Sequence, residues 1–246
     1  MQLRVYLAGR MSLLREDAVV DQADLPGAFG RHLLAFLLLR RAPVRRSDIA
    51  ETLGRTAVDG PFDATLNSTL SRLRTRLGSL GIDGRQCLVA TGGTVEFRRV
   101  IPMTVDVEAA IAACDRAGVA WRQGDADTAW ADAAVAYSVS IRPFLPNAEG
   151  LWIEQWQATL DDVRRRALQV IIETSLSSGD LHQAEVAAYR LVRDDPLRED
   201  SHRLLIRALI AAGDRARAKR ALLDLSSLLA EELDVEPSSE TLALLA

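Results

Sequence analysis

The most regular pattern of apolar and polar positions lies between residues 62 and 80. Four leucines recur there at helical spacing and fall within a narrow arc of one face: Leu66, Leu70, Leu73 and Leu77. Asp63 is suited to cap the start of a helix, and Gly78 and Gly81 are suited to its end. The pattern therefore predicts one amphipathic helix over residues 62–80.

The opposite face of this helix carries short hydrogen-bonding side chains bordered by arginines. They are Ser68, Ser71 and Thr75, flanked by Asn67, Arg72, Arg74 and Arg76. Such a face fits the major groove of DNA, where arginine can bind guanine or phosphate. A surface helix whose arginines are merely solvated explains the same pattern, so the helix by itself leaves both interpretations open.

The chain before this helix begins with strand-like alternation. Residues 2–8 alternate apolar and polar positions, which predicts a strand, and residues 11–15 can return as a second strand. Residues 27–41 have a dense apolar face typical of a helix, and Pro43 ends it. The first part of the chain is therefore expected to mix strands and helices.

A second, shorter helix is expected over residues 48–53. Ser47 is its predicted N-cap, and Gly54 follows its end. A loop containing Gly60 and Pro61 then leads to the helix of residues 62–80. Two helices in this order are typical of a helix-turn-helix unit.

Residues 87–100 predict a β-hairpin. Two β-prone runs flank the turn residues Gly92 and Gly93. The order of strands, three helices and hairpin indicates a winged helix-turn-helix, with the third helix in the major groove. Arg98 and Arg99 would lie at the base of the wing, near a phosphate backbone.

From residue 105 onward the pattern is helical and contains a repeat. Gly179-Asp180 precedes Ala184, and Gly213-Asp214 precedes Ala218, with an offset of 34 residues. That offset is the tetratricopeptide period. The alanine lets two helices approach closely, and the glycine turns the chain between repeats.

A third copy of the repeat lies further upstream. Gly124-Asp125 with Ala129 precedes Gly179 by 55 residues, which is one period plus an insertion of 21. Three repeats are the minimum for a stable stack. An irregular helical bundle is the open alternative. The aromatic residues of this region are expected mainly in its core: Trp121, Trp130, Trp152, Trp156 and Tyr189.

Charge divides the chain in the same place as the helical pattern. Residues 1–100 hold 15 Arg and 10 acidic residues, a formal charge of +5, whereas the remainder carries −9. A basic first part suits a polyanion. We expect a DNA-binding domain over residues 1–101 and an all-helical repeat domain over residues 102–246.

Several classes of protein are disfavoured. The three histidines are scattered, no nucleophile and base are paired in the sequence, and no GxxxxGK phosphate loop is present. Two cysteines suffice neither for a disulfide framework nor for a zinc cluster. We expect no catalytic residues, no metal site and no cofactor.

Without an apolar run of about 18 residues or a signal peptide, a cytoplasmic protein is expected.

Five segments resemble the Streptomyces antibiotic regulatory protein (SARP) family and its AfsR-like relatives. They are GRHLLAFLLLRRAPVRRSDIAETLG, LNSTLSRLR, FLPNAEGLWIEQW, DDPLREDSHRLLIRAL and LLAEELDVEPSSETLALL. The resemblance covers essentially the whole chain. It implies an OmpR-type winged helix followed by a tetratricopeptide-like bacterial transcriptional activator domain, a mostly α fold with a small β component. No phosphoacceptor, forkhead-associated or ATPase domain is recognised, as in the short form of the family.

The chain departs from the family pattern at two points. Leu53-Gly54-Arg55 stands where the family commonly has a tryptophan after the second helix, which affects packing beneath the DNA-binding helices. Asp234 stands where the family usually has glycine, and aspartate tolerates a left-handed backbone.

The resemblance implies a sequence-specific transcription activator that regulates a biosynthetic gene cluster. Its first implied partner is double-stranded DNA that carries direct repeats near a promoter. The others are RNA polymerase, contacted through its sigma factor, and a second copy of the chain bound to the same DNA. Two alternatives stay open. One is a regulator whose repeat domain binds a protein or small-molecule effector while DNA binding is weak. The other is a scaffold without DNA binding, against which the basic balance of residues 1–100 argues.

The expected boundary predicts that residues 102–246 fold on their own as a helical domain, since the repeats form a self-contained core. Circular dichroism and thermal melting of that fragment test this. An uncooperative melt, or substantial strand content, would contradict both the boundary and the repeat.

Overall fold

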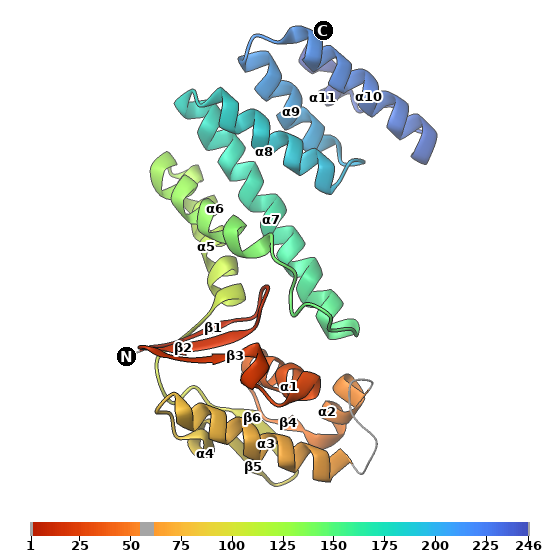
Figure 1. The fold of residues 1–246 in the computed structure, drawn as a ribbon. Coiled ribbons are helices and arrows are strands. Elements are labelled where there is room, and N and C mark those ends of the chain that lie inside the picture. The colour runs from red at the N-terminus through yellow and green to blue at the C-terminus, as the bar shows by residue number, and fades with distance from the viewer. Residues whose placement is uncertain (1, 55–61, 246) are drawn as a thin grey trace. The chain divides into compact units, whose positions relative to one another are not determined.

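The computed structural model describes residues 2–54 and 62–245, with side chains (Figure 1). The predicted loop containing Gly60 and Pro61 lies outside the described residues, as does Arg55. Contacts between Cα atoms divide the chain into two compact units, each described by itself below. The first unit comprises residues 1–109 and 139–161, and the second comprises residues 110–138 and 162–246.

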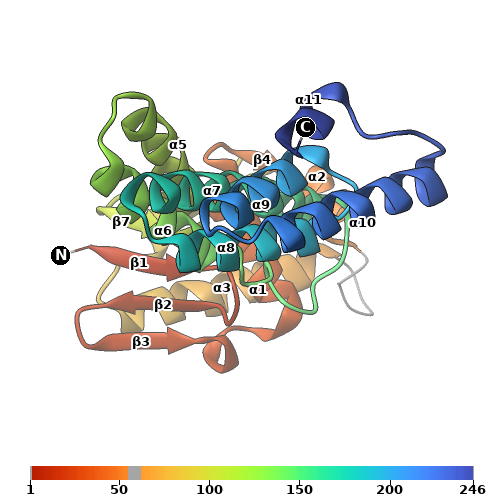
Figure 2. The ribbon, with the colours of Figure 1, turned by 90° about the horizontal axis from the view of Figure 1, so that it is seen from above.

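A four-stranded sheet opens the first unit. Its order is β3 (Ala18–Asp21), β2 (Ser12–Arg15), β1 (Leu3–Tyr6) and β7 (Met103–Val105). Figure 2 shows β1, β2 and β3 side by side; they pair antiparallel, whereas β7 pairs parallel with β1. The two strands predicted from alternation are therefore confirmed, and β3 and β7 were not predicted.

Four helices and a second sheet complete the winged helix. The helices are α1 (Gly27–Arg40), α2 (Arg46–Leu53), α3 (Phe62–Ser79) and α4 (Gly84–Cys87). The second sheet has the order β4 (Val44–Arg45), β6 (Thr94–Phe97) and β5 (Leu88–Thr91). The long amphipathic helix and the hairpin are confirmed.

Two local predictions in this region need correction. The Ser47 cap is wrong, because α2 begins at Arg46 with Arg45 as its N-cap, and the Ser47 hydroxyl bonds the Asp48 carboxylate at 2.9 Å. Cys87, expected in the first hairpin strand, instead ends α4. The Asp83 side chain caps that short helix by accepting from the Arg85 and Gln86 amides.

Residues 139–161 belong to the first unit although they follow two helices of the repeat region. The Gly9 amide donates to Pro143 at 2.8 Å, and the Leu145 amide donates to Leu7 at 3.0 Å. An aromatic cluster reinforces these bonds: the Trp152 ring lies 5.5 Å from Phe36. The division at residue 101/102 stays a prediction. In an isolated 102–246 fragment, which lacks Phe36 and Leu7, we expect residues 139–161 to melt ahead of the rest.

The Asp106 carboxylate joins the end of β1 to the start of α5 (Asp106–Arg122). One oxygen accepts from the Leu7 and Val107 amides, each at 2.8 Å, and the other accepts from Ala8 at 3.0 Å. The side chain is buried. Burial raises its pKa above the ordinary value, and the three amide hydrogen bonds and the Arg142 charge only partly offset that rise.

Paired helices form the second unit. They are α5 with α6 (Ala126–Ser140), α7 (Leu151–Ser178) with α8 (Leu181–Asp194), and α9 (Glu199–Ala211) with α10 (Arg215–Leu233). The short helix α11 (Ser239–Leu242) and a 3-10 turn (Ala243–Leu245) follow. This arrangement confirms the tetratricopeptide-like interpretation over the irregular bundle.

The same turn joins the two helices of every pair. Gly124, Gly179 and Gly213 have φ values of +80°, +81° and +79°, a left-handed conformation that glycine adopts without strain. The aspartate after each glycine accepts from the amide three residues on, which caps the second helix. The predicted alanines are buried at 0% exposure: Ala129, Ala184 and Ala218. No described helix is long and apolar enough to span a membrane.

Asp106→Asn is expected to destabilise the fold by about 1–3 kcal/mol, because the new amide group faces a backbone N–H that needs an acceptor. Because folding raises the pKa of Asp106, the free energy of unfolding of the parent falls as the pH rises from the ordinary aspartate pKa of 3.8 through the raised pKa. The variant has no titrating group at this position and should not show this pH dependence. Urea unfolding between pH 4 and 7 measures both effects. The exposed Asp224→Asn is the control, and equal stability of the two variants would contradict the assigned role.

Ala184→Leu is expected to destabilise the repeats by roughly 1–3 kcal/mol through overpacking, because the methyl group is fully buried. Ala230→Leu, at an exposed position of α10, should change little. Thermal melting of both variants makes the comparison. A melting temperature of Ala184→Leu equal to that of the parent would contradict the assignment of Ala184 to the closely packed position of the repeat.

Candidate nucleic-acid interface

Helix α3 is held by one apolar stripe. The four predicted leucines on it are each no more than 1% exposed, and Thr69 is also buried. α3 contacts α1 and α4, and its opposite face is open to solvent. The stripe therefore fixes which side chains of α3 can reach a ligand.

The solvent face of α3 carries six of the nine predicted DNA-binding residues. These exposed residues are Asn67, Ser68, Ser71, Arg72, Thr75 and Arg76. The Ser68 and Thr75 hydroxyls donate to helix carbonyls at 2.9 and 3.2 Å, which leaves their oxygens able to accept. Arg72 has neither a hydrogen bond nor an ion pair among the described residues. The face is polar and continuous, and among the described residues only Arg46 bonds one of the six, Asn67, at 2.9 Å.

Arg74 differs from its neighbours on α3. It is half-buried, and its Nε and Nη2 both donate to the Leu88 carbonyl, at 3.0 and 2.8 Å. Gly84 explains the close packing there, because a Cβ at this position would lie 2.4 Å from the Arg74 carbonyl oxygen. The guanidinium of Arg74 thus ties α3 to the first strand of the hairpin.

The hairpin projects a tight two-residue turn. Gly92 and Gly93 have φ values of +59° and +79°, as a type I′ turn requires. Arg98 follows β6 with a side chain 56% exposed, and its Nε donates to Glu96 at 2.8 Å. Arg98 therefore lies exposed at the base of the predicted wing, in an ion pair with Glu96.

Arg99 faces a different set of groups. Its Nη2 donates to the Leu38 carbonyl at 3.2 Å and to Glu108 at 2.8 Å. Arg41 donates to the same Glu108 carboxylate. The side chain of Arg99 is thus engaged within the first unit, next to the start of α5.

Two arginines beside α3 were missed from the sequence. Arg45 is exposed on β4, which pairs with β6, and the Arg46 amide donates to the Gly93 carbonyl in the hairpin turn. Arg46 also bonds Asp63 at 2.7 Å and Asn67 at 2.9 Å. The adjacent basic pair just before α2 was the available signal, and only the pairing of β4 shows that it lies near the wing.

Metal binding and nucleophilic catalysis find little support in the described residues. No group of three metal-ligating side chains is found among the described residues. Burial raises the pKa of both cysteine thiols, Cys87 and Cys114, so neither is an activated nucleophile.

The model of a known family matches residues 105–246, and that family is the bacterial transcriptional activator domain. The chain belongs to this family. The match spans more than half of the chain and contains all the paired helices of the second unit. This family match agrees with the resemblance to SARP-type transcriptional activators found in the sequence. No match is found among curated protein sequences.

A solved structure of EmbR from Mycobacterium tuberculosis, in complex with a low-affinity phosphopeptide, has a similar fold. Its TM-score is 0.86 at 23% sequence identity, over 99% of this chain. The chain spans 64% of the length of EmbR. The similarity confirms the fold class, an N-terminal winged helix followed by a helical, tetratricopeptide-like domain.

Proposed function

We propose that this regulator binds double-stranded DNA in a sequence-specific manner through α3 and the β5–β6 hairpin. The observation that carries the proposal is the solvent face of α3, which combines hydroxyl, amide and guanidinium groups opposite a fully buried stripe. Helices inserted in the major groove read bases with these groups. The formal charge of +5 over residues 1–100 supports binding to a polyanion.

The nine predicted residues divide by their surroundings. Ser68, Ser71, Arg72 and Thr75 lie on the open face of α3 and are proposed to contact base edges, with Asn67 beside them. Arg76 and Arg98, at the edge of that face and on the wing, are proposed to contact phosphate, and Arg45 joins them. Arg74 and Arg99 hold backbone carbonyls of the first unit, and we therefore leave them out of the proposed contact set.

The activator domain supports a second partner. We propose that the chain activates a biosynthetic gene cluster by binding direct repeats at a promoter, one copy per repeat, and contacting RNA polymerase through its sigma factor. The family match over residues 105–246 supports activation, and the repeated helices supply an extended protein surface. The alternative of a regulator with an effector-binding repeat domain is compatible with this arrangement.

Loss of Arg72 and loss of Arg98 are expected to act differently. Arg72→Ala should cost about 1–3 kcal/mol of binding free energy and relax the preference at one or two base positions. Arg98→Ala should weaken all sequences alike and reduce the slope of log affinity against log salt by about one unit. A selected-site binding assay at several salt concentrations measures both.

Arg215→Ala is the matched control, because it removes the same charge from an exposed position in the second unit. It should preserve both affinity and base preference. If Arg72→Ala and Arg98→Ala bind DNA with the affinity and base preference of the parent, α3 and the wing are not the DNA-binding elements. That result would favour the hypothesis of a scaffold without DNA binding.

A further inference from the structure

The second unit contains a cavity of about 480 Å³. Its walls come from the first helix of each pair, α5, α7 and α9, and from the C-terminal turn of residues 239–245. Apolar surface from Trp121, Val170 and Leu204 forms its lining, and four guanidinium groups stand around it. The size is that of a small-molecule site.

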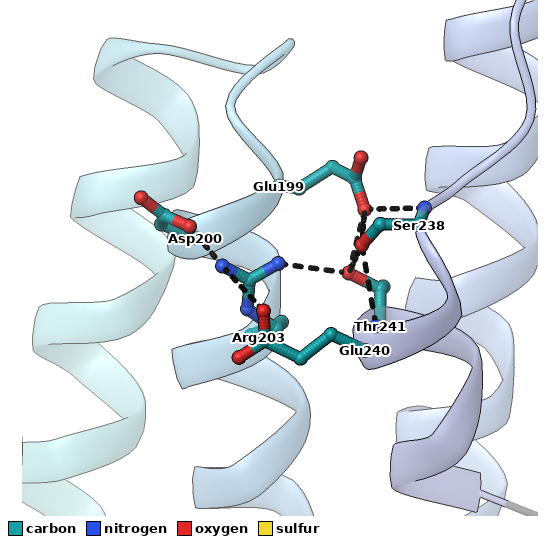
Figure 3. Close-up of polar contacts among 6 residues, drawn as sticks. All are labelled: Glu199, Asp200, Arg203, Ser238, Glu240 and Thr241. Atoms are coloured by element: carbon teal, nitrogen blue, oxygen red, sulfur yellow. Dashed lines mark hydrogen bonds and ion pairs between the residues drawn. The ribbon is translucent and has the colours of Figure 1, made fainter.

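The C-terminal wall of the cavity is fixed by a hydrogen-bond network (Figure 3). The Glu199 carboxylate accepts from the Ser238 amide at 2.9 Å, from its hydroxyl at 2.7 Å and from the Thr241 hydroxyl at 2.6 Å. Burial opposes ionisation of Glu199, but these bonds and the Arg203 charge outweigh it and lower the pKa. An ionised Glu199 therefore holds α11 against α9 at neutral pH.

Three of the four cavity arginines already have acidic partners. Arg207 bonds both oxygens of Glu173, at 2.6 and 2.9 Å. Arg166 pairs with Asp115 at 2.6 Å. Arg203 pairs with Asp200 and donates to the Thr241 hydroxyl, as Figure 3 shows. These arginines are held in place, and their charges are largely neutralised.

Arg122 is the arginine whose charge is available. It is exposed, and no hydrogen bond or ion pair of Arg122 is found within the parts of the chain that the structure describes. Its guanidinium lies over Gly118: a Cβ on that glycine would be 3.5 Å from Arg122 Nη1 and would meet nothing else within 4 Å. The free cation thus stands at the cavity, above a position without a side chain.

Gly118 lies in the interior of α5, where glycine is less favourable than alanine. Close helix packing is the usual reason for such a glycine, and it does not apply, because the space around the Cβ position is open. The glycine instead enlarges the cavity floor between Trp121 and Cys114.

We propose that this cavity binds a small molecule that joins an anionic group, a carboxylate or a phosphate, to an apolar body. The anion pairs with Arg122, which forms no ion pair with any residue that the structure describes, and the apolar body lies over Gly118 against Trp121 and Leu204. A charge-assisted hydrogen bond at the rim orients the ligand, and burial of its apolar body supplies the remaining affinity. This cavity shares no residue with the solvent face of α3 and does not depend on the proposed DNA contacts.

Three probes of one shape test the ligand class on the full chain by isothermal titration calorimetry. 1-Naphthoate and 1-naphthyl phosphate should bind, and the neutral 1-naphthylmethanol should bind at least about tenfold more weakly, as loss of a charge-assisted hydrogen bond predicts. The stronger of the two anions identifies the headgroup. Equal binding of the neutral probe, or no binding of either anion at millimolar concentration, would overturn the proposal.

Two variants locate the site. Gly118→Leu should melt at or above the parent temperature, since leucine favours the helix, yet it should abolish naphthoate binding by filling the floor. Arg122→Gln should weaken both anions about tenfold and leave the neutral probe unchanged, whereas the exposed Arg220→Gln of α10 should change neither. Parent-like naphthoate binding by Arg122→Gln, or by a cooperatively melting Gly118→Leu, would place the ligand elsewhere and overturn the proposal.

Discussion

The first unit depends on one buried carboxylate. Asp106 accepts hydrogen bonds from three backbone amides, two at the end of β1 and one at the start of α5. A buried backbone amide without a hydrogen-bond acceptor would destabilise the fold, and a buried carboxylate without a donor would do so more. The hydrogen bonds between them satisfy both groups. The chain segments joined there, residues 6–9 and 103–107, are nearly 100 residues apart in sequence. Leu7 and Gly9 then bond residues 143–145, so a third segment is held at the same point.

The second unit depends on repetition of a short turn. In each helix pair a left-handed glycine reverses the chain, an aspartate caps the next helix and a buried alanine sets the distance between helices. All three effects are local, which explains why a period of 34 residues was readable without knowledge of the fold. The first repeat is spaced differently because residues 139–161 are packed against the winged helix in the first unit.

The arginines show how tertiary contacts separate residues that look alike in sequence. Arg72 and Arg74 are two positions apart on α3, yet Arg72 is exposed while Arg74 bonds the Leu88 carbonyl. Arg98 and Arg99 are adjacent, yet only Arg98 remains on the wing surface. In the second unit, Arg166 and Arg207 pair with acids on neighbouring helices and Arg203 pairs with Asp200 on its own helix. Arg122 is the cavity arginine for which the described residues supply no such partner. Bonds to backbone carbonyls hold Arg74 and Arg99 within the first unit, whereas Arg98 stays exposed although its Nε donates to Glu96.

Local patterns in the sequence determined helices α1 and α3, the hairpin, the repeat and the open face of α3, because spacing along one helix or one turn decides each of them. Strand β7, the parallel partner of β1, carried no such signal, since three residues are too few to show alternation. The Arg46 contacts, the Arg74 tether and the place of residues 139–161 were equally hidden from the sequence. Each depends on groups distant along the chain that meet only after folding, and only the tertiary structure could decide them.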